Sequence, residues 1–160
     1  MQTIIFKWVA SFALISVGNC VAATTLPSSG TINLQSINKG TSMVKYNQEY
    51  MHGTITGVTF NEVDTGPMHM GKSACSYSIF SHKKIIRSVG FCALEDKEGD
   101  KIFIQYAGSS SAEGEWSGTD DVIGGTGKYK GIQGRGPYSC ANTHKDGEFP
   151  CTVKLEYQLP

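Results

Sequence analysis

Hydrophobic and polar positions alternate along this chain in short runs, and glycine, asparagine and aspartate separate the runs. In the clearest run, Val153, Leu155 and Tyr157 alternate with polar neighbours. A period of two residues is typical of a β-strand, whereas no stretch has the apolar period of a helix. The pattern therefore predicts an all-β chain. The predicted strands are Thr31–Asn38, Ser42–Tyr46, Thr54–Phe60, Lys72–Phe80, Ile86–Leu94, Ile102–Ala107, Glu115–Ile123, Gly136–Ala141 and Cys151–Leu159.

Strand number and connection length favour a closed antiparallel barrel. About eight strands with mostly short connections are typical of a barrel or a sandwich, and closure removes exposed edges that promote aggregation. We expect an eight-stranded barrel in which Gly124–Gly136 forms a sharp corner, because closely spaced glycines permit tight turns and bulges. At this strand number, the interior is either filled by side chains or holds one small ligand.

Turn signals predict how two pairs of neighbouring strands align. A three-residue loop at Lys97–Gly99, with its glycine in the left-handed conformation, places Leu94 opposite Ile102. A tight turn within His82–Ile85 sets position 75 against position 92.

Residues 1–23 have the features of a secretory signal peptide. Lys7 precedes an apolar run from Trp8 to Val17, and a small-residue site follows at Val21-Ala22-Ala23. The run is too short for a membrane-spanning helix, which needs about 20 apolar residues. A lipoprotein interpretation of Cys20 is the alternative, but Asn19 stands where a small residue is expected. We expect a signal peptide at 1–23, one domain at 24–160, and a secreted or periplasmic protein without a transmembrane segment.

The four cysteines after this leader predict disulfides, because the chain is directed to an oxidising compartment. Three pairings are possible. A four-residue loop at 144–147 places Cys140 opposite Cys151, and the turn at 82–85 places Cys75 opposite Cys92. Hairpin geometry therefore favours Cys75–Cys92 and Cys140–Cys151 over the other two pairings.

Composition argues against several function classes. Lysine plus arginine number 14, as do aspartate plus glutamate, and no basic run occurs. Nucleic acids and anionic membrane surfaces are therefore poor candidate partners. The segment around Lys128 lacks the spacing of a phosphate-binding loop, because Val122 stands where glycine is needed and Tyr129 stands where serine or threonine is needed. We expect no cofactor.

The run GGTGKYKGIQGRGPY, Gly124–Tyr138, follows a predicted strand that bears Trp116. It resembles the corresponding segment of the allene oxide cyclase and dirigent barrel superfamily, which includes bacterial secreted members of unassigned function. The resemblance implies an eight-stranded barrel with a central cavity. In plant members that cavity guides cyclisation of an allene oxide or coupling of phenoxy radicals. Their catalytic residues lie outside the matched segment, so the resemblance assigns no role to individual residues here.

Asp120 is the candidate acid or base. In a strand it shares a face with Trp116, so one carboxylate of the Asp120-Asp121 pair can point inward. A buried carboxylate needs a partner, for which Arg87, Arg135 and His69 are candidates. The alternative is a surface aspartate at a strand end. Tyr106 and Trp116 are candidate cavity residues, although aromatic strand residues are more often plain core.

Methionine and histidine form the candidate metal site. Met68, His69 and Met70, with His52, offer thioether and imidazole ligands that suit cuprous copper. Methionine also fills irregular cores without binding metal. The acidic residues near 95–100 could bind calcium, but a solvated hairpin tip fits their spacing better.

These observations leave three function classes open. We favour a non-catalytic module that binds a small hydrophobic molecule or has a structural role, because cavities are common in such barrels and catalytic motifs are absent. The alternative is a lyase or isomerase, of cyclase type, that acts on a hydrophobic substrate in the barrel. A copper-binding protein is the third. Ligand identity and oligomeric state stay open.

Overall fold

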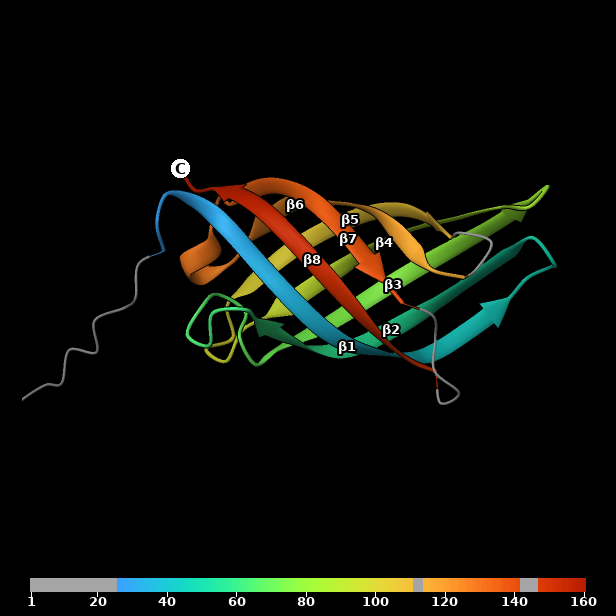
Figure 1. Ribbon diagram of the computed structural model, residues 1–160, viewed down its shortest axis with the longest axis horizontal. Coiled ribbons are helices and arrows are strands. Elements are labelled where there is room, and N and C mark those ends of the chain that lie inside the picture. The colour runs from blue at the N-terminus through green and yellow to red at the C-terminus, as the bar shows by residue number, and fades with distance from the viewer. Residues whose placement is uncertain (1–25, 111–113, 142–146) are drawn as a thin grey trace, which may run out of the picture.

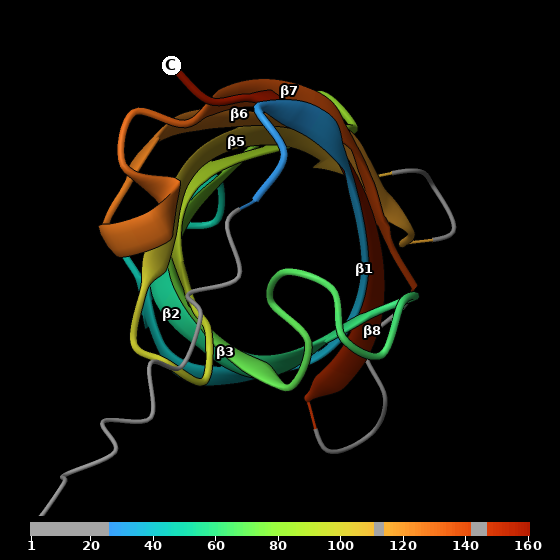
Figure 2. The same cartoon turned by 90° about the vertical axis from the view of Figure 1, so that its left-hand side faces the viewer.

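The protein folds into a closed barrel of antiparallel strands in the order β1 to β8, with β8 pairing back to β1 (Figures 1 and 2). The computed structural model describes residues 26–110, 114–141 and 147–160, so the predicted signal peptide lies outside the described residues. The barrel and its strand number are as the sequence predicted. The strands are β1 (Ser29–Lys45), β2 (Tyr50–Asn61), β3 (Gly71–His82), β4 (Ile85–Glu95), β5 (Lys101–Ser110), β6 (Trp116–Gly125), β7 (Gln133–Cys140) and β8 (Glu148–Gln158).

β1 corrects one prediction. The sequence divided this region into two strands, Thr31–Asn38 and Ser42–Tyr46, whereas the structure has one strand of 17 residues. Its register against β2 shifts between Gly40 and Ser42, so Thr41 is the extra residue of a β-bulge. The bulge interrupts the regular register without ending β1, so pairing with β2 continues from Ser42 to Lys45.

The two predicted turn registers are correct. Leu94 lies opposite Ile102, and Gly99 has a φ of 89°, the left-handed conformation that the three-residue loop requires. Cys75 lies opposite Cys92 across the turn between β3 and β4. That turn places Lys83 and Lys84 at φ values of 47° and 69°, without a glycine.

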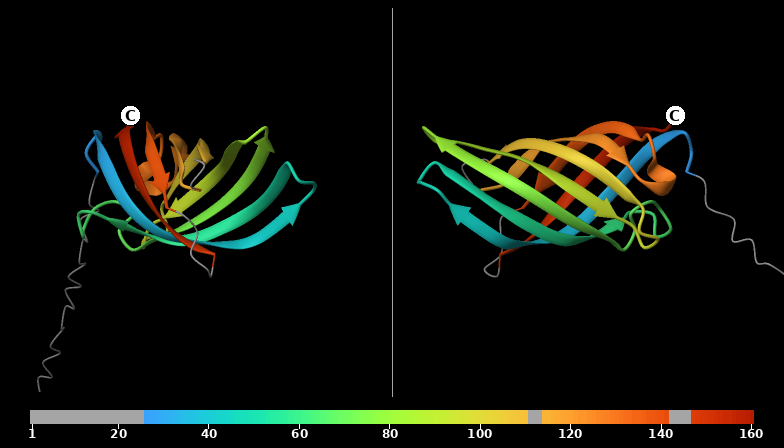
Figure 3. Two further views of the ribbon diagram at one scale, coloured as in Figure 1. Left: turned by 45° about the vertical axis from the view of Figure 1, so that its right-hand side comes forward. Right: turned by 180° about the vertical axis from the view of Figure 1, so that it is seen from behind.

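At one end of the barrel, two hairpins project beyond their neighbours: β1 with β2, and β3 with β4 (Figure 3). Their outer faces carry a stack of aromatic rings, in which the Tyr50 ring lies 5.1 Å from Tyr46 and 4.9 Å from Phe80, between centroids. No helix in the described part of the chain is long and apolar enough to cross a membrane.

The glycine-dense segment closes the opposite end. Between β6 and β7 the chain forms the 3-10 helix η1 (Gly127–Tyr129) and a turn at Gly131, with φ values of 52° at Gly127 and 81° at Gly131. A register shift between Phe103 and Ile104 marks a bulge at the facing part of β6. The corner carries the Tyr129 side chain into the interior, where it is fully buried.

This end of the interior is filled by apolar side chains. Met68 enters from the β2–β3 loop, which lies across the end of the barrel in Figure 2, and Ile132 enters from the corner. We call this region the filled half. Its core consists of Ile32, Leu34, Met68, Leu94, Ile102, Ile104, Val122, Tyr129, Ile132, Leu155 and Tyr157.

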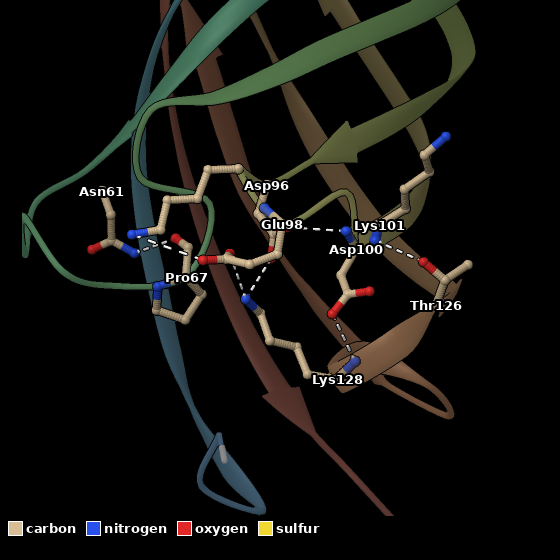
Figure 4. A network of polar contacts seen from close by, with 9 residues as sticks. Asn61, Pro67, Asp96, Glu98, Asp100, Lys101, Thr126 and Lys128 are labelled. Carbon is tan, nitrogen blue, oxygen red and sulfur yellow. Dashed lines mark hydrogen bonds and ion pairs between the residues drawn. The ribbon is translucent and has the colours of Figure 1, made fainter. Parts of the chain in front are cut away.

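A buried ion pair ties the β4–β5 turn to the glycine corner (Figure 4). Lys128 Nζ lies 2.6 Å from the Asp96 carboxylate, whose other oxygen accepts hydrogen bonds from the backbone N–H groups of Glu98 and Asp100. Burial alone would raise the pKa of Asp96, but the Lys128 and Asp100 hydrogen bonds outweigh it and lower the pKa. The prediction of a solvated hairpin tip is thus wrong for Asp96. This residue is only 6% exposed, because Lys128 covers it.

Candidate functional site

The other half of the barrel interior is hollow. It contains a cavity of about 670 Å³, lined by side chains from all eight strands. This volume lies within the range of about 300–1,000 Å³ that is typical of small-molecule sites. We call this region the hollow half. The filled half forms its floor, through Leu34, Leu94 and Ile104.

Tyrosines lie against the cavity wall opposite glycines. Tyr77 faces Gly53, Tyr106 faces Gly90, and Tyr138 faces Gly118, each on the neighbouring strand. A Cβ atom on any of these three glycines would collide with the facing ring. The rings therefore lie over neighbouring backbone and occupy less of the lumen than rings that point at its axis.

Asp120 is the ionisable centre of this cavity. It lies on the inner face of β6, is 7% exposed, and is the cross-strand partner of Tyr106. Burial, and secondly the charge of Asp121, raises the pKa of Asp120 to about 7. Its carboxyl group therefore changes charge near neutral pH, which an exposed aspartate does not do.

The tyrosines beside Asp120 stay protonated. Burial, with a smaller contribution from Asp120, raises the pKa of Tyr106 to about 12. The pKa of Tyr138 is also raised, first by burial and then by Asp120 and Tyr106. The two rings meet edge to face with centroids 5.9 Å apart, and the Tyr106 hydroxyl donates to the Ser76 carbonyl over 3.2 Å.

None of the three predicted cationic partners reaches the cavity. Arg135 pairs with Asp121 on the outer surface, with 3.0 Å between its Nε and the carboxylate. Arg87 is exposed on β4, next to the inward-facing Ser88. His69 lies in the β2–β3 loop, where its Nδ1 is 3.3 Å from the Asn61 carbonyl oxygen. Strand alternation explains the result for Arg135, which shares the outer face with Asp121.

Both aromatic candidates line the cavity, as do residues that the sequence analysis did not select. Tyr106 and Trp116 are lining residues, together with Tyr77 and Tyr138. The available signal for Tyr138 was its position two residues before Cys140, on the same strand face. Polar lining residues hold one another: Asn38 donates to Ser36 over 2.8 Å and accepts from Ser73 over 3.2 Å.

The two disulfides have the pairing that hairpin geometry favoured, Cys75–Cys92 and Cys140–Cys151. Each joins directly opposed positions of adjacent strands, and all four cysteines line the cavity. A disulfide stabilises a fold by roughly 2–4 kcal/mol, mainly by restricting the unfolded chain. Here both crosslinks brace the wall of the hollow half.

The four candidate copper ligands are not brought together. His52 lies near the start of β2, with Nδ1 3.3 Å from Ser78 Oγ, whereas His69 contacts Asn61 at the end of that strand. The intervening strand spans roughly 30 Å at about 3.3 Å per residue. Met68 is 1% exposed in the core and Met70 is 68% exposed. Among the described residues, no group of three or more His, Cys, Asp or Glu is placed to hold a metal.

A scan against protein-family models and a search of curated proteins each find no match to this sequence.

Proposed function

We propose that this protein binds a small hydrophobic molecule inside the barrel, without chemical turnover. The observation that carries the proposal is the cavity of about 670 Å³, lined mainly by apolar and aromatic side chains with a few polar groups. Such a lining is typical of ligand sites, in which apolar area provides affinity and polar groups orient the ligand. The hollow interior favours binding over a purely structural role.

The cavity wall is suited to hold its shape before a ligand arrives. Two disulfides cross-link adjacent strands around it, and each tyrosine lies over a glycine of the next strand. Preformed walls reduce the entropy lost on binding, because fewer side chains must be ordered. The same disulfides, together with the leader-like residues 1–23, support a secreted or periplasmic location.

A lyase or isomerase is the second candidate, and Asp120 is the observation that favours it. A carboxyl group with a pKa of about 7 is suited to donate or accept a proton near neutral pH. The resemblance of Gly124–Tyr138 to allene oxide cyclase and dirigent barrels agrees with this candidate, although that argument is an analogy at the level of the fold. A purified protein that converts a bound substrate, and loses turnover but not binding in Asp120→Asn, would favour the enzyme.

The binding proposal is tested with a neutral apolar dye, Nile red, whose fluorescence rises when it leaves water. We expect saturable binding at one equivalent. Val153→Trp fills the cavity from β8 and should abolish binding, while Val58→Trp, at a 44% exposed position on β2, should not. Ile55→Trp provides a second cavity-filling variant if Val153→Trp does not fold. Absence of dye binding by the wild-type protein, or equal binding by all variants, would refute the proposal.

A further inference from the structure

The lining of the cavity is unbalanced in charge. Among the described residues that line it, Asp120 is the only acid, and none is lysine, arginine or histidine. The nearest side-chain cation along the neighbouring strand, Arg135, is paired with Asp121 outside. A negative charge can therefore form in the hollow half, and no cation among the described lining residues offsets it.

An ionised carboxylate in this position is costly. Asp120 is only 7% exposed to solvent, and Asp121 is its neighbour in the chain. Buried charges in proteins are normally paired, because removal from water is unfavourable without a compensating charge. A positively charged ligand group would supply that compensation, and none of the described lining residues carries a positive charge that would repel it.

Aromatic rings in the same cavity add a second attraction for a cation. Tyr106 and Tyr138 meet edge to face beside Asp120, and Tyr77 and Trp116 also line the cavity. The faces of such rings attract ammonium groups, which is how aromatic cages recognise amines. The tyrosines remain neutral, because burial raises the pKa of Tyr106 and of Tyr138, so they add no competing charge at neutral pH.

We propose that the cavity selects hydrophobic amines: molecules with an apolar body and a protonated amino group that pairs with the Asp120 carboxylate among the tyrosine rings. This inference rests on the proposed binding function. Carboxylate ligands are disfavoured, because they would place a second negative charge beside Asp120. Neutral ligands of the same shape bind through apolar contact alone and lack the charge pairing.

The test compares three probes of nearly equal shape: 4-phenylbutylamine, 4-phenylbutanol and 4-phenylbutyrate. Each competes with Nile red at pH 8, where the amine is protonated and Asp120 is ionised. We expect the amine to bind about tenfold more tightly than the alcohol or better, a typical effect of a charged hydrogen bond, and the carboxylate to bind weakest.

Two isosteric variants assign the preference to one carboxyl group. Asp120→Asn should remove the difference in affinity between the amine and the alcohol, and saturable Nile red binding by this variant checks that it is folded. The Asp121 side chain faces solvent and pairs with Arg135, so Asp121→Asn should keep the amine preference. An amine preference that survives in Asp120→Asn would overturn the inference.

The pH dependence of the amine preference provides an independent test. The groups that face Asp120 are Tyr106 on β5 and Tyr138 on β7, and Asp121 is adjacent on β6. The pKa of Asp120 is raised to about 7, and the raised pKa values of Tyr106 and Tyr138 keep both tyrosines neutral, so the amine preference should shrink between pH 8 and pH 6. If Nile red binds but no probe charge is preferred, the amine inference fails and the binding function stands. If Nile red itself does not bind, both fail.

Discussion

The two halves of the barrel interior are built by the same strands but have opposite contents. In the filled half, Ile102, Leu155 and Tyr129 are fully buried against one another. In the hollow half, the inward-facing residues of these strands include serine, cystine and tyrosine around a cavity of about 670 Å³. The tyrosine rings lie over glycines of the neighbouring strands. Strand alternation determines which residues face inward, and residue size then determines whether the space is filled.

Connecting segments increase the difference between the halves. The β2–β3 loop and the glycine corner insert Met68, Tyr129 and Ile132 into the filled half. At the opposite end, the β1–β2 and β3–β4 hairpins project beyond the barrel (Figures 1 and 3). The filled half thus supplies most of the apolar core, while disulfides brace the hollow half.

The comparison is most strongly tested by matched isoleucine truncations. Ile102→Ala removes a fully buried side chain from the filled half and should lower the free energy of unfolding by about 2–5 kcal/mol. Ile79→Ala changes a side chain that lines the existing cavity and should cost about 1 kcal/mol or less, because it loses fewer contacts. Urea denaturation measures both. Equal losses would mean that the hollow half is packed as tightly as the filled half.

The buried aspartates should respond to pH in opposite directions. Asp96 is paired with Lys128 and its pKa is lowered, so its stabilising contribution is present above the unfolded pKa and is lost as pH falls through the folded pKa. The pKa of Asp120 is raised to about 7, so its contribution is present below about pH 4 and is lost as pH rises to about 7.

At pH 8, Asp96→Asn should therefore destabilise the protein and Asp120→Asn should stabilise it, each by about 1–3 kcal/mol. Urea denaturation at pH 5 and pH 8 measures the change, and the stabilising effect of Asp120→Asn should grow with pH. Destabilisation by Asp120→Asn at pH 8 would show that the carboxylate is favourably paired in the fold.

The smallest expected effect concerns the tyrosine and glycine pairs of the hollow half. Gly90→Ala places a methyl group against both the Ser76 carbonyl oxygen and the Tyr106 ring and should cost about 1 kcal/mol or more, because the β3 backbone and the ring must both shift. Gly40→Ala, where a Cβ meets nothing within 4 Å, should be nearly neutral. Thermal unfolding and Nile red affinity measure both variants. Equal behaviour would indicate that the ring positions do not keep the cavity open.

Much of the fold could be predicted from local patterns. Alternation in Cys151–Leu159 and the turns at His82–Ile85 and Lys97–Gly99 depend on neighbouring residues, so they indicated strands, two registers and the Cys75–Cys92 disulfide correctly. The Cys140–Cys151 pairing is also correct, although most of the loop from which it was predicted, 144–147, lies outside the described residues. The prediction for β1 was wrong at Gly40–Ser42, because the extra residue of a β-bulge interrupts the two-residue alternation and resembles the end of a strand in the sequence.

The candidate site was predictable only in part. The pattern aligned Asp120 with Trp116, and both line the cavity. The sequence could not show whether Arg135 pairs with Asp120. The pairing of β6 with β7 places Arg135 opposite Asp121, on the outer face of the barrel. The interpretation of Met68 as a candidate ligand shows the same limit, since its burial in the core depends on a loop that crosses the barrel end.

The amino-acid pattern alone determined that the chain forms β-strands, where several turns lie, and which cysteines face each other, because these properties arise between near neighbours. Closure of the barrel decided which end is filled, that Asp120 faces a cavity in which none of the described lining residues is a cation, and that tyrosines lie over glycines of adjacent strands. Those properties depend on residues distant in sequence that only the paired strands bring into contact.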